Sequence, residues 1–159
     1  MLSTQWHVQH AGDGDIDLPE AWDVATGDPA TVIAVVDTGV DWSHPDLQGA
    51  MWTNPLETPG NGLDDDGNGW VDDIHGWDAG NDDGDPRPEV YQELGIDVGF
   101  HGSHCAGIAA AATNNAAGVA GAGWGCSLMG VKVNDSAGAI TTESVTEALQ
   151  YAVANGASV

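Results

Sequence analysis

The sequence predicts an α/β fold of three layers, in which a mostly parallel sheet carries helices on both faces. Two apolar runs, residues 31–36 and 127–133, lack polar alternation, which is typical of strands buried on both faces of a parallel sheet. Residues 100–112 are rich in alanine and glycine and predict a helix that can approach such a sheet closely. Residues 142–155 predict an amphipathic helix. At 159 residues, the chain is long enough for one domain with a core.

The chain is strongly acidic. It carries 25 aspartates and glutamates against 2 lysines and arginines, a formal net charge of −23 at pH 7. Nucleic acid and anionic membranes repel such a chain, so we expect neither as a partner. No segment approaches the ~20 apolar residues of a transmembrane helix, and residues 1–14 lack the pattern of a signal peptide. The acidity suggests a calcium-rich or salty, extracellular setting.

The first elements along the chain lead to a carboxylate. Residues 18–24 predict a short helix that begins with Pro19 at its first position. The strand at 31–36 follows, and Asp37 ends it. Open α/β sheets place their active sites at the carboxyl ends of central parallel strands, which makes Asp37 a candidate site residue. On the residues alone, a simple cap of the strand end is an equally good interpretation.

The segment 61–73 indicates a calcium loop. Asp64, Asp66 and Asn68 alternate and Gly69 follows, which matches the D-x-D-x-N-G opening of such loops. His75 occupies the twelfth position, where an EF-hand has a bidentate glutamate, so a later aspartate must replace it. Hard oxygen ligands suit calcium, and the predicted ones come from Asp64, Asp66, Asn68, Trp70 (through its carbonyl), Asp72 and Asp73. The alternative is a solvated acidic turn.

After this loop, residues 75–78 predict a short strand, and residues 81–88, with their acidic and proline residues, predict a surface linker. The helix at 100–112 then presents two histidines at its start. His101 is a candidate general base, because the unperturbed histidine pKa of about 6.5 lies near working pH. The alternatives for His101 and His104 are a helix cap with a core histidine, or a metal pair, although helical zinc pairs are spaced i, i+4.

Two cysteines are too few for a disulfide scaffold. Cys105 and Cys126 lie among small or apolar residues and have no metal-ligand spacing, so we expect two buried thiols. A disulfide between them is the alternative. The glycines of the loop at 113–125 do not form a dinucleotide-binding G-x-G-x-x-G before a helix, which disfavours a nucleotide-binding domain.

The last elements complete the predicted sheet. The strand at 127–133 is mostly apolar and therefore predicted to be central. The helix at 142–155 is expected to have Thr142 as N-cap and Gly156 as C-cap residue. Residues 157–159 are expected to begin another buried strand. The predicted apolar face of the helix consists of Val145, Leu149, Ala152 and Val153.

Taken together, two signatures resemble the subtilisin-like serine proteases. They are Asp37-Thr38-Gly39-Val40-Asp41 with His44-Pro45-Asp46-Leu47, and His101-Gly102-Ser103-His104-Cys105-Ala106-Gly107, with Cys105 similar to the proteinase K variant. The order aspartate, then histidine, is that of subtilisin. The resemblance implies that Asp37 orients His101 and stabilises its protonated form, while His101 relays the proton of a serine nucleophile. It implies a structural role for His104.

The resemblance also implies binding sites. Residues 57–90 resemble the acidic insertion of some bacterial members, where it is a stabilising calcium site. Residues Gly138, Ala139 and Ile140 resemble the edge segment that binds a substrate peptide as an added strand, although an ordinary strand-to-helix connection fits them equally well. The loop at 113–121 resembles the family's tight calcium loop, with side-chain ligands Asp46 and Asn115 and carbonyl ligands Thr113, Ala117 and Val119.

The resemblance covers the whole chain but only the first half of a family catalytic domain, so the predicted fold is incomplete. The family's nucleophile lies in a Gly-Thr-Ser-x-Ala motif, and no serine here has that context. We therefore expect residues 1–159 to be the amino-terminal portion of a secreted, calcium-stabilised endopeptidase, without its signal and propeptide. Its partners would be a polypeptide substrate and the missing carboxyl-terminal half, and it would be inactive alone. The alternative is a catalytically dead, calcium-binding relative that acts as a binding module.

Overall fold

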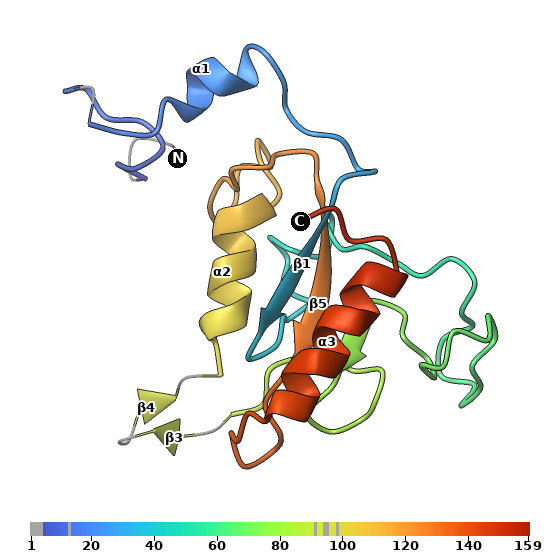
Figure 1. The fold of residues 1–159 in the computed structure, drawn as a ribbon. Coiled ribbons are helices and arrows are strands. Elements are labelled where there is room, and N and C mark those ends of the chain that lie inside the picture. Colours follow the sequence, from blue (N-terminus) through green and yellow to red (C-terminus); the bar gives the residue numbers. More distant parts are fainter. Residues whose placement is uncertain (1–4, 13, 91, 94–95, 98) are drawn as a thin grey trace.

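The computed structural model describes residues 5–12, 14–90, 92–93, 96–97 and 99–159, and the side chains of 91–98 lie outside the description. Its centre is a parallel three-stranded sheet in the order β1-β5-β2, formed by β1 (Val32–Asp37), β5 (Ser127–Lys132) and β2 (Gly76–Asp78). Helix α2 (His101–Ala110) covers one face and α3 (Thr142–Ala154) the other (Figure 1). The predicted three-layer α/β fold is confirmed.

The register of the sheet aligns the carboxyl ends of its strands. Val32 pairs with Ser127 and Asp37 with Lys132 along β1 and β5, while Asp78 of β2 also pairs with Lys132. Strand β5 is central, as predicted. Strand β1 pairs with β5 along one edge, and Val32 and Val35 within it are buried while its other residues are half-buried.

Residues 157–159 do not form a buried strand. Their backbone runs along the outer edge of β1, where the amide of Ser158 donates to Val32 O (2.8 Å) and the amide of Ala34 donates to Val159 O (2.9 Å). Ser158 and Val159 are exposed. The backbone pairing predicted for this segment is therefore present without the burial.

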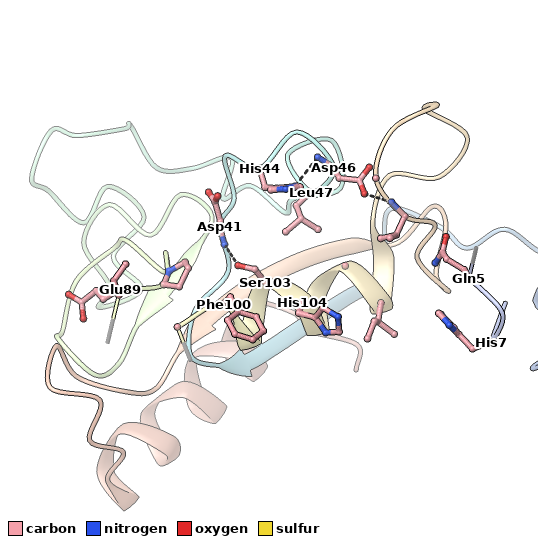
Figure 2. A pocket seen from close by; sticks show the side chains of 17 residues that line it. Gln5, His7, Asp41, His44, Asp46, Leu47, Glu89, Phe100, Ser103 and His104 are labelled. Atoms are coloured by element: carbon pink, nitrogen blue, oxygen red, sulfur yellow. Dashed lines mark hydrogen bonds between the residues drawn. The ribbon is translucent and has the colours of Figure 1, made fainter. Parts of the chain in front are cut away.

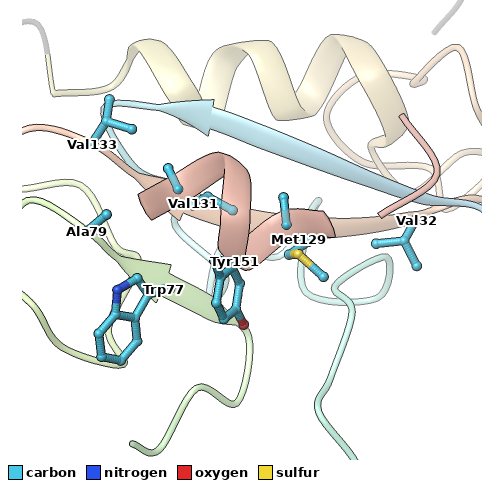
Figure 3. Close-up of a cluster of buried hydrophobic side chains, with 9 residues drawn as sticks. Val32, Trp77, Ala79, Met129, Val131, Val133 and Tyr151 are labelled. Atoms are coloured by element: carbon cyan, nitrogen blue, oxygen red, sulfur yellow. The ribbon is translucent and has the colours of Figure 1, made fainter. Parts of the chain in front are cut away.

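Each face of the sheet has its own core. On the α2 face, Val35, Leu47 and Leu128 pack against the buried alanines of α2. On the α3 face, Met129, Val131 and Trp77 pack against Tyr151 and its neighbours on α3 (Figure 3). Because small residues predominate on the buried side of α2, this helix lies close to the sheet, as its composition predicted.

The predicted apolar face of α3 is correct for Ala152, which is buried, and for Val145, which packs against the core, but it is wrong for Leu149 and Val153. Leu149 and Val153 are 54% and 77% exposed, whereas Ala148 and Tyr151 are completely buried. The N-cap is Thr141, one residue before the expected Thr142, and it forms a capping box in which Thr141 Oγ1 accepts the amide of Ser144 (3.0 Å) and Ser144 Oγ accepts the amide of Thr141 (3.2 Å). This box turns Ser144 inward, and with it Ala148 and the aromatic ring of Tyr151.

Two peripheral segments are also held in place. Helix α1 (Leu18–Trp22) contains Pro19 in its first turn, and Trp22 Nε1 donates to Ala122 O (3.0 Å). The segment 81–88 is not a free linker, because the amide of Asp78 donates to Asp83 O and the amide of Val40 donates to Pro86 O, both at 2.8 Å. A short hairpin of β3 (Gln92–Glu93) and β4 (Ile96–Asp97) follows it.

The capping box gives a stability test. Thr141→Ala removes a side-chain acceptor for an amide of the first turn and is expected to lower the free energy of unfolding by about 1 kcal/mol. Thr142→Ala, at the residue that the sequence predicts as N-cap, is the matched control and should change it by less than about 0.5 kcal/mol. Urea unfolding of both variants measures the difference, and equal losses would contradict the observed cap.

Candidate active site

The central feature of the site is a contact between Asp37 and His101. Nδ1 of His101 lies 2.7 Å from Oδ1 and 2.9 Å from Oδ2 of Asp37. The strand end supplies the carboxylate and the first residue of α2 supplies the imidazole. The two predicted catalytic residues are thus brought together across 64 positions of sequence.

Hydrogen bonds fix both partners. The Asp37 carboxylate accepts the amide of Thr38 (2.7 Å), and its backbone carbonyl accepts the amide of Val133 (3.0 Å). Thr38 Oγ1 accepts the amide of Gly102 and donates to Gly99 O, each at 3.0 Å. Because Thr38 joins the end of β1 to the first turn of α2, the positions of the carboxylate and the imidazole are coupled.

Two glycines allow this approach. A Cβ at Gly102 would lie 2.4 Å from Gly39 O and 3.0 Å from the Cβ of Asp37. Gly39 has a φ of 109°, and a Cβ there would lie 2.8 Å from Pro86 O. Side chains at either position would push α2 or the segment 86–88 away from the strand end.

The contact with Asp37 determines the tautomer of the neutral His101 ring. The Asp37 side chain is 16% exposed and that of His101 is 62% exposed. Because a carboxylate accepts hydrogen bonds, the contact assigns the proton of the neutral ring to Nδ1 and leaves Nε2 able to accept another.

Cys105 lies beside the pair without competing for its role. Its Sγ is 3.7 Å from Nδ1 and 3.9 Å from Nε2 of His101. Burial, and then the nearby charge of Asp37, raise the pKa of the Cys105 thiol, so the thiol stays protonated and weakly nucleophilic. Cys105 and Cys126 are both free thiols, as expected, but they are half-buried and not buried.

No serine hydroxyl among the described residues hydrogen-bonds to His101. The nearest candidate in sequence, Ser103, uses its Oγ to accept the amide of Asp41 (2.9 Å). The site as described therefore holds a base and its orienting carboxylate. It can accept and return a proton.

A groove of about 770 Å³ runs along the outward side of α2 (Figure 2). Phe100, His104 and Ile108 of the helix side line it, and all three are exposed. His104 therefore faces the groove and is not the buried core histidine considered above. It also belongs to neither cluster of metal-capable side chains found among the described residues, so the His101–His104 metal pair has no support.

The loop after α2 folds onto Asp46. The buried Asp46 carboxylate accepts the side-chain amide of Asn115 and the backbone amide of Val119, each at 2.7 Å. Gln5, which the sequence did not single out, is also buried here and exchanges two hydrogen bonds with Ala120. An isolated glutamine in a polar segment carries no pattern that could have indicated this. Thr113 and Ala117 lie on the same loop.

The acidic insertion divides its carboxylates into two groups. Asp66 and Asp73 converge with Glu57, with one oxygen of each within 4.8 Å of the others. Asp64 and Asp72 lie outside this cluster and accept backbone amides of the surrounding turns. The sequence missed Glu57, because it precedes the alternating pattern and belongs to no recognised spacing. The remaining predicted ligands take other contacts: Asn68 donates to Asp66 and Asp73, and the Trp70 ring packs on Tyr151.

The predicted substrate segment forms a tight turn after β5. The amides of Gly138 and Ala139 donate to Asp135 (2.9 and 2.8 Å), and Ala139 O accepts the amide of Asp135 (2.9 Å). Ile140 is exposed and bridges to Asn134. These amides and this carbonyl are engaged within the turn, which leaves less of the backbone for an added strand.

Comparisons with known proteins identify the family of the chain. The model of the subtilase family matches residues 28–159. Thermitase of Thermoactinomyces vulgaris is 36% identical over 93% of this chain and 42% of its own length. The thermophilic serine proteinase of Bacillus sp. (strain AK1) is 37% identical over 87% of this chain and 27% of its own length.

A comparison with solved structures finds a protease with a similar fold. A chain described as proteases from Pseudoalteromonas arctica PAMC 21717 aligns with a TM-score of 0.67 and 27% identity, over 99% of this chain and 43% of that one. The chain thus spans less than half the length of these relatives. None of the described helices has the length and apolar character needed to cross a membrane.

The glycine contact gives the second test. Gly102→Ala is expected to lower the free energy of unfolding by about 1–3 kcal/mol, because its Cβ would overlap the backbone of Gly39. Gly107→Ala in the same helix is the control: its Cβ would meet Val119 Cγ2 at 3.9 Å, so the change should be neutral or stabilising by up to about 1 kcal/mol. Denaturant unfolding measures both, and a harmless Gly102→Ala would refute the close approach.

Proposed function

The chain belongs to the subtilase family, and on that premise we propose that it supplies the acid–base half of a serine endopeptidase that hydrolyses peptide bonds. The observation that carries the proposal is the 2.7 Å contact between His101 Nδ1 and Asp37 Oδ1. The substrate is a polypeptide. The serine nucleophile and the oxyanion-stabilising asparagine come from outside these 159 residues, in the carboxyl-terminal half of the same catalytic domain.

In this mechanism His101 moves one proton in each half-reaction. Nε2 takes the proton of the serine hydroxyl as its oxygen attacks the peptide carbonyl, and Asp37 stabilises the resulting imidazolium. The imidazolium then protonates the leaving amine, the C–N bond breaks, and an acyl-enzyme remains. Water adds to the acyl group in the same way, and His101 takes its proton and returns it to the serine.

We further propose that calcium stabilises the fold in two places. The first is the loop at 113–121, where the carboxylate of Asp46, the side-chain oxygen of Asn115 and the carbonyls of Thr113, Ala117 and Val119 would bind the ion. The second is the acidic insertion, with Asp64, Asp66, Asn68, Trp70, Asp72 and Asp73 as the ligands that the sequence predicts. An all-oxygen donor set, including the buried carboxylates of Asp46 and Asp73, fits a hard cation.

Two further features complete the proposal. Residues Gly138, Ala139 and Ile140 form one wall for an extended substrate, using the backbone groups that the turn leaves open. The protein acts outside the cell. The high acidity supports this setting, and one similar protein, from Xanthomonas campestris pv. campestris, is named an extracellular protease.

The role of the Asp37–His101 pair is tested in the full protein. Asp37→Asn keeps the size of the side chain but presents the wrong hydrogen-bonding partner to Nδ1, so kcat for a fluorogenic peptide is expected to fall about 10⁴-fold with little change in KM. Asp41→Asn, in the same signature, is the control and should leave kcat within a few-fold. The 159 residues alone should give no steady rate.

Three results would contradict the proposal. Asp37→Asn with wild-type kcat would remove the dyad from the chemistry. A full protein that binds calcium but never cleaves peptides would favour the binding-module alternative. A steady rate from residues 1–159 that His101→Ala abolishes would place a nucleophile within this chain.

Calcium binding at the first site is tested by thermal unfolding in calcium and in EDTA. A ligand present at 100 times its Kd stabilises the folded state by about 2.7 kcal/mol. Asp46→Asn removes the buried charge, so calcium should raise the unfolding temperature less than in wild type. Asp23→Asn, an exposed aspartate at the end of α1, controls for the lost charge. An undiminished calcium effect in Asp46→Asn would rule out this site.

A further inference from the structure

We propose that Lys132 is a positioning residue of the peptidase: its buried ammonium offsets the carboxylates at the end of the sheet beside Asp37 and so extends the activity of the Asp37–His101 pair toward lower pH. The inference rests on the proposed function and deepens it, because Lys132 would act through Asp37 without relaying the proton itself. Lys132 lies within a mostly apolar run and belongs to none of the motifs described above.

Lys132 shares one rung of the sheet with two aspartates. Asp37 of β1 and Asp78 of β2 are both its register partners at the carboxyl ends of the strands. The preceding rung packs in the core on the α3 face and consists of Val36, Val131 and Trp77. Because side chains alternate along a strand, the three charged side chains point to the opposite face, where α2 begins. Lys132 thus stands between the two aspartates, one strand spacing of about 4.8 Å from each.

The ammonium of Lys132 is removed from water and held by oxygen atoms. Nζ donates to Asp78 Oδ2 (2.7 Å) and to Asn134 O (2.8 Å), and it lies 3.4 Å from Glu89 Oε2. The Lys132 side chain is completely buried and that of Asp78 is 4% exposed. Water screens charges poorly at such a site, so each charge acts over a longer range than it would at the surface. The field of Lys132 therefore reaches Asp37, whose side chain is itself largely buried.

Cations are scarce in this chain, and one of its two basic side chains lies in this rung. Lys132 and Arg87 stand against 25 aspartates and glutamates. Arg87 is half exposed and binds Asp85 at 2.6 Å. The carboxylates around Lys132 come from β1, from β2 and from the segment 81–90, and they are Asp37, Asp78, Asp83 and Glu89. Removing Lys132 leaves these carboxylates without the charge that offsets them.

The charge beside Asp37 acts on the protonation of His101. Asp37 holds the imidazole at 2.7 Å, and the neutral thiol of Cys105 also lies beside the ring. A nearby negative charge favours the imidazolium, whereas a nearby positive charge favours the neutral ring. Because His101 must be neutral at Nε2 to accept the serine proton, a lysine that offsets the carboxylates keeps the base available at lower pH.

A purely structural role for Lys132 is the alternative, and it leads to a different result. The bond from Nζ to Asn134 O fixes the start of the turn after β5, and Asn134 bridges to Ile140 at its end. If this anchoring were the whole contribution of Lys132, its loss would raise KM or lower stability to the same extent at every pH. Loss of a compensating charge instead moves the pH profile.

The pH profile of kcat/KM for a fluorogenic peptide, measured with the full protein, tests the inference. Lys132→Met is expected to move the acid limb of the profile to higher pH by about 0.5–1 unit, because the charge of Asp78 is no longer offset. Asp78 stays ionised in this variant, since it also accepts the amides of Gly80 and Asn81. Asp78→Asn leaves the lysine in excess and should move the limb to lower pH. The double variant Lys132→Met/Asp78→Asn removes both charges and should return the limb to its wild-type position.

Arg87→Met is the matched control, because it removes the other cation of the chain from a half-exposed site that water screens, and it should leave the acid limb in place. Urea unfolding of each variant measures any loss of stability separately. If Lys132→Met does not fold, Asp78→Asn and the double variant decide the question.

An acid limb at the wild-type pH in every variant that folds would overturn the inference, even where kcat/KM falls, and leave the proposed function standing. Shifts of Lys132→Met and Asp78→Asn in the same direction would overturn it as well. A wild-type kcat in Asp37→Asn would instead overturn the proposed function, and this inference with it.

Discussion

The arrangement of the candidate active site depends on one close contact between two backbones, at Gly39 after β1 and Gly102 in the first turn of α2. With no Cβ at Gly102, the helix start lies against the strand end, where a methyl group would stand 2.4 Å from Gly39 O. Thr38 fills the remaining space and bridges the two elements. The Asp37–His101 distance is therefore set by packing of the main chain, and the two side chains need little rotational freedom to meet.

The acidity of the chain determines which groups its carboxylates bind. A net charge of −23 leaves few carboxylates with an ion-pair partner, so backbone and side-chain amides solvate them instead. Asp37, Asp46 and Asp64 all accept amide hydrogen bonds. Such bonds stabilise a single carboxylate well, but they do not remove repulsion between neighbouring ones. Where Glu57, Asp66 and Asp73 meet, the amide hydrogen bonds therefore leave this repulsion in place.

Much of the fold could be predicted from the sequence, because runs of apolar residues indicate buried strands and runs of small residues indicate a helix packed close to a sheet. The runs at 31–36 and 127–133 gave β1 and β5, and the alanine-rich segment gave α2 within two residues of its ends. Asp37 and His101 were found because each stands at the end of such an element. The buried face of α3 was predicted only in part: Val145 and Ala152 do face the core, but the burial of Ala148 and Tyr151 was missed, because it depends on how Tyr151 packs against the sheet. Periodicity of aliphatic residues pointed to Leu149 and Val153, which remain exposed.

The clustered carboxylates of the acidic insertion show the same limit in another form. A spacing pattern detects acidic residues that follow one another along a loop, and it singled out Asp66 and Asp73 in this way. Glu57 joins them through a turn of the insertion that carries no pattern of its own. The cluster and Tyr151 lie on the α3 side of the sheet, whereas Asp37 and His101 meet on the α2 side. Because the sheet separates the two, the geometry of the Asp37–His101 pair depends on the glycine contact and not on the acidic cluster.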